Sequence, residues 1–305
     1  MTEKSHPPEG TPPADRFERI PLGLRWINDG FEVAPIVAGF GMALADMTNA
    51  KAALRILRDA KIPGTMAHLI VRACALALAR NPQCHRMVSS YTRVFPGQVD
   101  IGLSMIGRTT YAPIVVLPAM DRKPLSALIP AVIEALDAAG EKEERDLETM
   151  RRQFWLIPFG FLRRFILRRL NKWMWFRRRI AGTFQVSTVP MVDVVGSLVY
   201  CTSAGLATGS IRDRVVAIDG KAVVRPTMWL TLSGDHAALD GVIAAVLLNA
   251  IKDTIEGEDL VREAREASEA RRAANGAPRA LGVGQPSPAG PPLAPSVEAL
   301  QNGTE

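Results

Sequence analysis

Cysteine and histidine are scarce in this chain. The 305 residues include three cysteines and four histidines. Cys74, Cys84 and Cys201 are an odd set without a Cys-x-x-Cys pair, so the sequence predicts neither a disulfide scaffold nor a cysteine-bound zinc ion. A reducing cytoplasm fits this usage best. The histidines show no His-Glu-x-x-His spacing, so no metal ion is expected.

The chain also lacks an apolar leader. Its first 15 residues are polar and proline-rich, which argues against a secretory signal and therefore against export. With 48% hydrophobic residues, the chain can bury one sizeable core or two modest ones. The net charge of +6 favours an acidic partner, which could be an anionic cofactor, a phospholipid surface or a nucleic acid.

The two ends differ in composition from the middle of the chain. Residues 1–16 contain four prolines and no apolar periodicity, and residues 273–305 are rich in alanine, proline and glycine. Such segments bury too little apolar surface to fold alone. We therefore expect disordered flanks at 1–16 and 273–305 around one globular domain at 17–272.

Within this domain, apolar spacing changes repeatedly between helical and extended patterns. We expect helices at 50–59, 64–79, 124–138 and 241–255, and strands at 99–106, 111–117, 183–189, 214–216 and 228–233. Pro82 should end the second helix, and Pro130 should restart or kink the third. Asp219-Gly220, between two apolar runs, predicts a tight hairpin turn. These elements indicate an α/β fold in mixed order.

The most informative stretch is 228–241, Met-Trp-Leu-Thr-Leu-Ser-Gly-Asp-His-Ala-Ala-Leu-Asp-Gly. It leads from an apolar strand into His236 and on to Asp240, a His-x-x-x-Asp-Gly pattern. A neutral imidazole held at a strand end can take a proton from a thiol or hydroxyl as it attacks an acyl carbonyl, which typically adds about 10²–10⁴ in rate. Asp240 is expected to hold the loop by pairing with an arginine. From spacing alone, an ordinary loop histidine and Asp-Gly turn explain the pattern equally well.

The same stretch resembles the signature of the catalytic domain of dihydrolipoamide acyltransferases, the acyl-transferring subunits of 2-oxo acid dehydrogenase complexes. It is also similar to the histidine motif of chloramphenicol acetyltransferases. Residues 65–82 resemble a helix of the family, 99–118 a strand pair, and 182–188 its Gly-x-Phe-Thr-Ile-Ser stretch. The resemblance covers about 17–258. It implies an α/β two-layer sandwich of the chloramphenicol acetyltransferase type, with a mixed sheet and helices on one side.

The resemblance also implies the chemistry. His236 becomes the general base, and Ser187 becomes the hydroxyl that hydrogen-bonds the tetrahedral oxyanion. The family's site lies between neighbouring chains of a trimer, so a homotrimer or a larger assembly is implied. Coenzyme A or acyl-coenzyme A is the implied substrate, with no covalently bound cofactor. If the alignment slips, Thr188, Ser197 or Thr202 takes the place of Ser187.

Three departures from the family pattern bear on the exact function. Ala237 follows the histidine where relatives in dehydrogenase complexes have arginine, Thr-Val-Pro-Met follows Ser187, and no lipoyl domain precedes the catalytic region. We therefore expect a stand-alone acyltransferase that moves an acyl group between coenzyme A, or another thioester, and a thiol or hydroxyl acceptor. The alternatives are a non-catalytic assembly or membrane-tethering relative, and a subunit that uses a lipoyl protein in trans.

Residues 154–179 form a basic and aromatic insert relative to the family. Arg164, Arg168 and Lys172 recur every four residues, which predicts an amphipathic helix with too many charges to span a bilayer. The segment from Phe154 to Arg179 is therefore expected to lie on an anionic membrane surface. The alternative is that its apolar face packs on the body or on a neighbouring subunit. Nucleic acid is not expected as a partner, because no binding motif accompanies the charge.

Overall fold

The computed structural model describes residues 22–23, 26, 39–89, 92–104, 113–196, 199, 201–235 and 238–276. His236, the expected boundary at 16/17 and most of the expected C-terminal flank lie outside the described residues. The final helix continues to Gly276, so the expected start of that flank at 273 is four residues too early.

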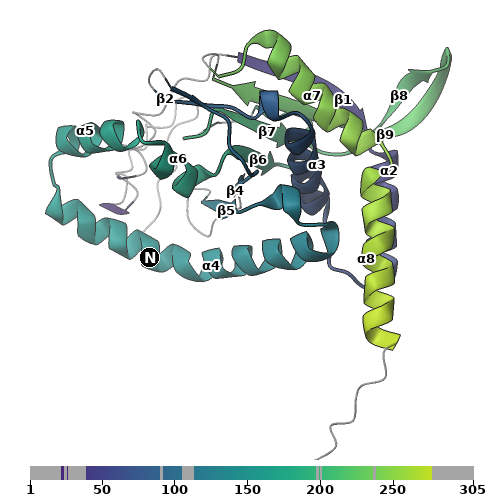
Figure 1. Cartoon of the computed structure of the whole chain (residues 1–305), viewed down its shortest axis with the longest axis horizontal. Coiled ribbons are helices and arrows are strands. Elements are labelled where there is room, and N and C mark those ends of the chain that lie inside the picture. Colours follow the sequence, from purple (N-terminus) through teal and green to yellow (C-terminus); the bar gives the residue numbers. More distant parts are fainter. Residues whose placement is uncertain are drawn as a thin grey trace, which may run out of the picture.

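A seven-stranded mixed sheet forms the centre of the molecule (Figure 1). Six strands lie in the order β1-β9-β7-β6-β4-β5, and β8 pairs with β9. The two contacts β7·β6 and β6·β4 are parallel and the others antiparallel. The strands are β1 (Gly39–Asp46), β4 (Ile101–Ser104), β5 (Ile114–Leu117), β6 (Phe184–Thr188), β7 (Ala204–Thr208), β8 (Arg212–Ile218) and β9 (Lys221–Gly234). Two short strands, β2 (Met87–Ser89) and β3 (Thr92–Val94), form a separate ribbon.

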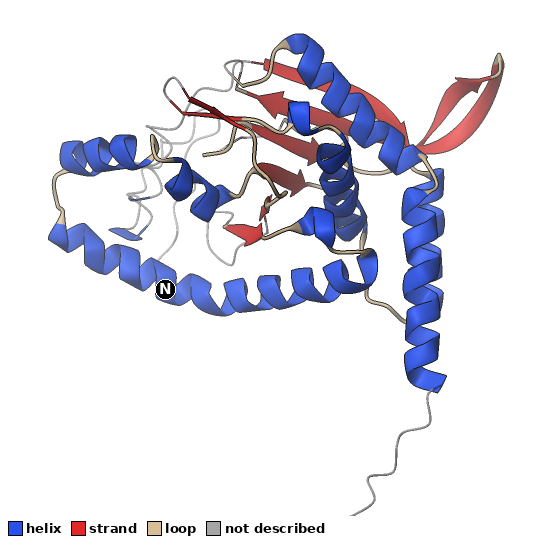
Figure 2. Cartoon of the chain, in the orientation of Figure 1, coloured by secondary structure: helices blue, strands red, loops and turns tan. Residues whose placement is uncertain are grey.

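Seven helices are described beside the sheet (Figure 2). They are α2 (Thr48–Asp59), α3 (Met66–Arg80), α4 (Leu125–Leu156), α5 (Gly160–Leu170), α6 (Met174–Ala181), α7 (Gly241–Glu256) and α8 (Asp259–Gly276). Two 3₁₀ turns, η1 (Pro82–Cys84) and η2 (Met120–Arg122), connect them to the strands. None of these helices is long and apolar enough to cross a membrane.

The core lies between one face of the sheet and the helices, because alternate residues of each strand point to the same side. Leu103, Val186, Leu206 and Leu230 are buried from four neighbouring strands, together with apolar residues of α2, α3, α4, α7 and α8. The predicted mixed sheet with helices on one side is confirmed for these five helices. The short helix α6 instead ends above the other face, where the Ala181 carbonyl lies so close to Gly102 that a Cβ there would clash.

Most of the expected elements are present, with informative differences. The expected third helix is the 32-residue α4, which continues through Pro130 without a break. Pro130 is the sixth residue of α4, beyond the unpaired N–H groups of the helix start, so it removes one intrahelical hydrogen bond without ending the helix. Strands β1, β2, β3 and β7 and helix α8 were missed. Helix α8 was missed because its sequence is dominated by charged residues, yet it packs on α2 and α4 through Leu260 and Ala264.

A buried ion pair fixes α8 to the body. The Arg72 guanidinium on α3 donates to both carboxylate oxygens of Glu263, with Nη2 to Oε1 at 2.7 Å. The same carboxylate accepts from the backbone N–H of Leu125, at the start of α4. Breaking a buried, fully bonded pair is strongly destabilising, so Glu263 sets where three helices meet.

The predicted hairpin at Asp219-Gly220 is confirmed. Both residues have positive φ, 50° and 74°, which is the geometry of the type I′ turn that Asp-Gly favours. Strand β9 continues without interruption from this turn to Gly234, past Pro226. The distal part of the hairpin projects beyond the helices as a two-stranded arm (Figures 1 and 2).

Candidate active site

The backbone around the expected catalytic histidine is held on both sides. At the end of β9, the Asp235 N–H donates to the Ser203 carbonyl at 2.8 Å. The Asp235 carbonyl accepts from the N–H groups of Ala238 and Leu239, both at 2.9 Å. His236 itself lies outside the described residues. The residue before it is therefore anchored to Ser203, just before β7, and to the two residues that precede the cap of α7.

Asp240 begins that helix. It is the N-cap residue of α7, and its Oδ1 accepts from the Ile243 N–H at 2.9 Å. This bond satisfies one of the donors that a helix start leaves unpaired. The expected partner was an arginine, but no ion pair joins Asp240 to an arginine among the described residues. Asp240 instead fixes the start of α7.

Replacing Asp240 tests this capping role. We expect Asp240→Ala to lower the free energy of unfolding by about 1 kcal/mol, because alanine offers no oxygen to the helix N–H groups. Asp240→Asn should change stability little, since asparagine caps equally well. Urea unfolding of both variants measures the difference. Equal losses in the two variants would show that the charge, and not the cap, matters.

Ser187 lies on β6, on the sheet face away from the core helices. Its neighbours Val186 and Phe184 are buried in the core, so Ser187 points to the opposite side. The side chain is half-buried. Within the described part of the chain, the Ser187 hydroxyl makes no hydrogen bond, so it is available to a ligand at this face.

The sheet register separates Ser187 from the histidine loop of the same chain, that is, residues 235–240 between β9 and α7. Ser187 pairs with Ala207, which pairs with Thr231, whereas β9 ends three residues later at Gly234. Two strand spacings across and three residues along give roughly 14 Å between the Ser187 and Gly234 backbones. Ser187 lies toward the carboxyl end of β6. The loop after β9 leaves the sheet at the opposite end of the strands, where the amino ends of β6 and β7 lie. A single chain therefore does not bring the two segments together through its sheet.

The structure distinguishes Ser187 from the alternative residues for the oxyanion role. Thr188 is the next residue along β6 and points to the other face. Thr202 is buried, and its hydroxyl donates to the Ala204 carbonyl at 3.1 Å. Ser197 lies outside the described residues. Among the described candidates, only Ser187 has a hydroxyl that makes no hydrogen bond within the described residues and that lies on the second face of the sheet, the face away from the core helices.

Sequence reasoning missed that this second face is polar and buried. Gln185, Thr231 and Ser233 are each at most 3% exposed, and the register places all three on the same face as Ser187. The Thr231 hydroxyl is buried and has no hydrogen-bond partner among the described residues. The alternation of Thr231 and Ser233 with Leu230 and Leu232 was the sequence signal, since period-two polarity in a strand marks two different faces.

Arg177 of α6 binds the segment that anchors the histidine loop. Its buried guanidinium donates to the carbonyl of Cys201 at 2.7 Å, to the carbonyl of Val88, and to Ser203 Oγ at 3.4 Å. The backbone carbonyl of the same Ser203 accepts from the Asp235 N–H. Burial lowers the pKa of Arg177, and the nearby Asp235 opposes this shift. The basic insert therefore contributes a structural arginine to the base of the site.

Comparison with known proteins finds a match for the segment that contains the candidate site. The sequence profile of the 2-oxoacid dehydrogenases acyltransferase (catalytic domain) family matches residues 181–261, which include Ser187, His236 and Asp240. This segment of the chain is therefore similar to the catalytic domain of these acyltransferases. The predicted resemblance is confirmed, and at the level of sequence it is confined to this segment, whereas the expectation was about 17–258.

One curated relative of this family is the dihydrolipoyllysine-residue succinyltransferase component of the 2-oxoglutarate dehydrogenase complex of Rickettsia bellii. It is 39% identical over 84 residues, which are 26% of this chain and 20% of the relative. The chain thus aligns with only about a fifth of that protein's length.

Two solved structures of the family share the fold. They are the cubic core of the pyruvate dehydrogenase multienzyme complex and the dihydrolipoamide acetyltransferase of Azotobacter vinelandii. Each has a TM-score of 0.59 at 19% identity, over 85% of this chain and 99% of its own. At this identity the likeness concerns the fold, and it extends well beyond the segment matched by sequence.

A shallow apolar cavity lies next to the family motif. It has a volume of about 440 Å³ and lies between β1, the end of β9 and the first turns of α7. Its walls include Met42, Leu232, Leu239 and Ala244, with Asp240 at the rim. Such a cavity can accept an apolar portion of a ligand close to the histidine loop.

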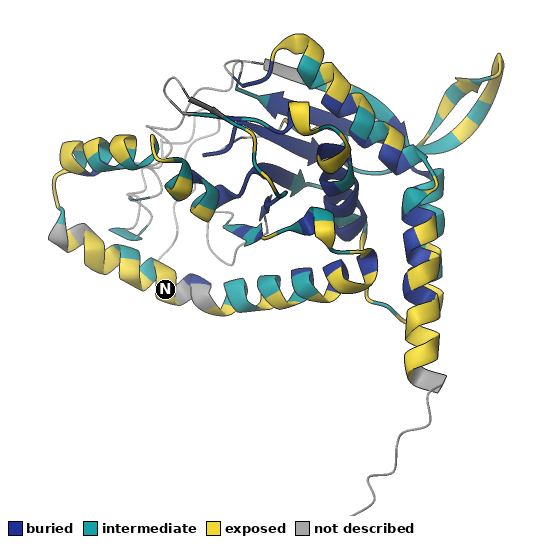
Figure 3. Cartoon of the chain, in the orientation of Figure 1, coloured by how far each residue is buried: buried dark blue, intermediate teal, exposed yellow. Residues whose placement is uncertain are grey.

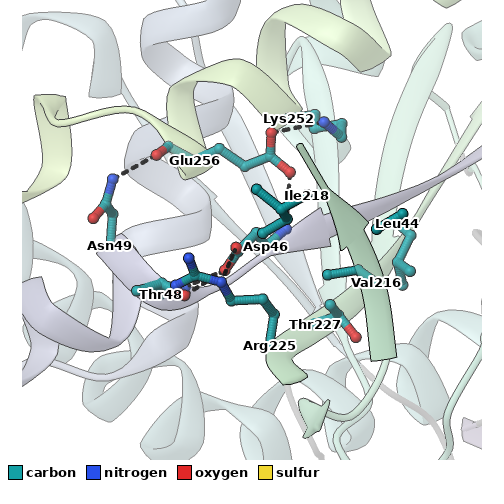
Figure 4. Close-up of a pocket in the computed structure, with 11 residues that line it drawn as sticks. Leu44, Asp46, Thr48, Asn49, Val216, Ile218, Arg225, Thr227, Lys252 and Glu256 are labelled. Atoms are coloured by element: carbon teal, nitrogen blue, oxygen red, sulfur yellow. Dashed lines mark hydrogen bonds and ion pairs between the residues drawn. The ribbon is translucent and has the colours of Figure 1, made fainter. Parts of the chain in front are cut away.

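A larger cavity of about 570 Å³ lies beneath the hairpin arm and is distinct from the motif (Figure 4). Its polar groups bond mainly to one another. Glu256 accepts from Lys252 Nζ at 2.6 Å and from the Asp46 N–H at 2.8 Å, while Asn49 donates to the Glu256 carbonyl at 2.6 Å. These bonds join the start of α2 to the end of α7. The polar side chains that line this cavity therefore have a structural role and do not require a ligand.

The other described histidines serve the core. His68 caps its own helix, with Nδ1 accepting from the Thr65 N–H at 3.0 Å, and burial lowers its pKa. His85 follows η1 and is 4% exposed, with no partner for Nε2 among the described residues. Burial lowers the pKa of His85 to about 4, although Asp100 opposes the shift.

The low pKa of His85 predicts that acid destabilises the fold. An unfolded chain binds the proton with a pKa near 6.5, so between pH 6.5 and 4 the unfolded state holds more protons. As the pH is lowered from 6.5 to 4, the free energy of unfolding should fall by up to about 3 kcal/mol. The stability contributed by neutral His85 is fully present above pH 6.5. In His85→Gln this part of the pH dependence should disappear, as urea unfolding at pH 5 and 7.5 would measure. A variant with the wild-type pH slope would contradict the prediction.

Proposed function

We propose that this protein is an acyltransferase that moves an acyl group between coenzyme A and a thiol or hydroxyl acceptor. His236 is the general base, and Ser187 is the hydrogen-bond donor to the oxyanion. The observation that carries the proposal is the family match at 181–261, because it contains both residues in one continuous segment. The available Ser187 hydroxyl and the anchored loop around His236 support it.

The reaction needs one proton carrier and one oxyanion donor. The His236 imidazole takes the proton from the attacking thiol or hydroxyl, and the freed sulfur or oxygen adds to the acyl carbonyl carbon. The carbonyl oxygen becomes an oxyanion, to which the Ser187 hydroxyl donates. When the intermediate collapses, the bond to the departing thiol breaks, and that thiol recovers the proton from the imidazolium. No metal ion takes part in these steps.

We further propose that each site is shared by two chains of a homotrimer. The separation of roughly 14 Å within one chain supports this, since an oxyanion donor must lie within hydrogen-bond reach of the atom that the base activates. The cubic core, a solved structure with this fold, is itself an assembly. Closed cyclic symmetry would bring Ser187 of one chain to the histidine loop of the next.

The Azotobacter protein supports the choice of residues. A serine, a histidine and an asparagine have been examined there for roles in catalysis, in that order along the chain, and the asparagine follows the histidine by four positions. Here Ser187, His236 and Asp240 stand in the same order, with the same spacing of four. Aspartate and asparagine are interchangeable as N-caps, so the loop can be held in the same way.

The acceptor is proposed in two forms. The first is a free thiol or hydroxyl compound, used without a lipoyl domain. The second is a lipoyl group on a separate protein, which is favoured by the name of the curated relative, a dihydrolipoyllysine-residue succinyltransferase. A non-catalytic relative used for assembly is the remaining alternative.

A thiol-release assay separates these possibilities. Purified full-length chain is mixed with a series of acyl-coenzyme A donors, from acetyl and succinyl to long-chain acyl, with dihydrolipoamide, a lipoylated domain or no acceptor. Turnover with dihydrolipoamide or another small acceptor supports the stand-alone enzyme. Turnover only with the lipoylated domain supports action in trans. A correctly assembled protein that turns over no donor would refute acyl transfer.

A further inference from the structure

The positive charge of the chain is concentrated in one segment. Residues 149–192 contain ten basic residues and no acidic residue, while the rest of the chain contains 27 basic and 31 acidic residues. The overall charge of +6 therefore comes from this segment, which includes the end of α4, α5 and α6. A local excess of this kind attracts an anionic partner.

The same segment exposes a cluster of large aromatic side chains. Six aromatic residues between positions 155 and 175 are at least 60% exposed: Trp155, Phe159, Phe161, Phe165, Trp173 and Trp175. Soluble proteins normally scatter such residues singly over the surface, and a gathered patch marks an interaction site. The expected alternative, that this apolar face packs on the body of its own chain, is wrong for these six side chains.

Helix α5 shows how the aromatic and basic groups are combined. Phe161, Leu162 and Phe165 are exposed in its first half, and Arg168 and Arg169 are exposed in its second half. Since residues three and four apart share a helix face, the apolar and basic groups follow one another along the same exposed side. Figure 3 shows α5 largely exposed, at the far end of the long α4 and away from the sheet.

Three of the ten basic residues stabilise the fold. Arg163 is buried beneath α5 and donates to the carbonyls of Ile157 and Pro158 at 3.0 and 2.9 Å. Arg177 supports the histidine loop, and Arg178 pairs with Asp100 at 2.8 Å. The Arg163 bonds hold α5 against the turn that follows α4, and the bonds of Arg177 and Arg178 hold α6 to the body.

We propose that this surface, Trp155 to Trp175, binds to an anionic phospholipid bilayer. Phenylalanine and tryptophan side chains enter the boundary between headgroups and acyl chains, and Arg168 and Arg169 contact lipid phosphates. With 11 residues, α5 is about 16 Å long and lies parallel to the bilayer plane. A second copy related by a two-fold axis fits this surface poorly, because such pairing would bring the same positive patches together.

Vesicle co-sedimentation of the full chain tests the proposal. We expect binding to vesicles that contain phosphatidylserine, little binding to pure phosphatidylcholine, and weaker binding as salt is raised. Arg168→Gln with Arg169→Gln should weaken binding about 30-fold, which corresponds to roughly fivefold for each arginine near the surface. Phe161→Ser with Phe165→Ser should weaken it at least as much. A matched control is Arg271→Gln with Arg272→Gln, two exposed arginines of α8, which should bind as the wild type does.

Three outcomes would overturn the proposal, provided that circular dichroism shows each variant to be folded. The first is equal binding to neutral and anionic vesicles. The second is a charge variant of α5 that binds as tightly as the α8 control. The third is a wild-type chain that ignores vesicles but changes its oligomeric mass when Phe161 and Phe165 are replaced, or is retained on a labelled RNA oligonucleotide.

Discussion

Replacing His236 with alanine is expected to lower kcat for acyl transfer by about 10²–10⁴-fold. The loss is large because the described residues between Asp235 and Asp240 are Ala238 and Leu239, neither of which can accept the proton of the nucleophile. KM for the acyl donor should change much less, since the imidazole acts on the proton in the transition state and contributes little to ground-state binding. Steady-state thiol release at several donor concentrations measures both constants.

The control for His236 is His6→Ala, the same change made outside the family-matched segment. It should retain wild-type turnover. Size-exclusion chromatography and thermal unfolding must also show that His236→Ala assembles normally. If His236→Ala retains wild-type turnover, the acyl-transfer role of the motif is refuted, and the alternative of an ordinary loop histidine stands.

Ser187→Ala is expected to lower kcat by about 10²–10³-fold, which is the usual cost of losing one oxyanion donor. The change removes only a hydroxyl from the end of β6, so stability should alter little. Thr188→Ala is the matched control, because Thr188 is the next residue and points to the opposite face of the sheet. A large loss in Thr188→Ala with none in Ser187→Ala would move the oxyanion role to the neighbouring residue.

Mixing the two inactive variants tests whether two chains share one site. If one chain supplies the base and its neighbour supplies Ser187, random mixed trimers of His236→Ala and Ser187→Ala chains contain some sites with both groups intact. About one quarter of the wild-type activity should then return after co-expression. If each chain carries a complete site, every site lacks one group and no activity returns. The register separation of roughly 14 Å predicts the first result.

Local sequence patterns determined much of the fold. The helices α2, α3 and α7, the strands β6 and β9 and the Asp219-Gly220 turn each follow from short-range signals, such as apolar period, proline position and the preference of Asp-Gly for positive φ. The motif around His236 and its family were also accessible from the sequence. Both depend on the order of residues along a few turns of chain, which the sequence states directly.

Long-range contacts decided the rest. Helix α8 has the composition of a solvated helix and was missed, because its place depends on the buried Arg72–Glu263 pair, which joins residues 191 positions apart. The partner of Asp240 was also mistaken. The carboxylate caps α7, and the sequence signal for this was its position directly before the helix expected at 241–255.

The sequence by itself determined the acyltransferase motif, the basic and aromatic character of 154–179, and most of the elements. Only the tertiary structure decided that Ser187 and the end of β9 lie at different places in the sheet of one chain, because strand register is set by pairing between distant segments. It also decided that Phe161 and Phe165 face outward while Arg163 is buried. Helical period gives the two sides of a helix, but which side the protein covers depends on what the rest of the chain packs against it.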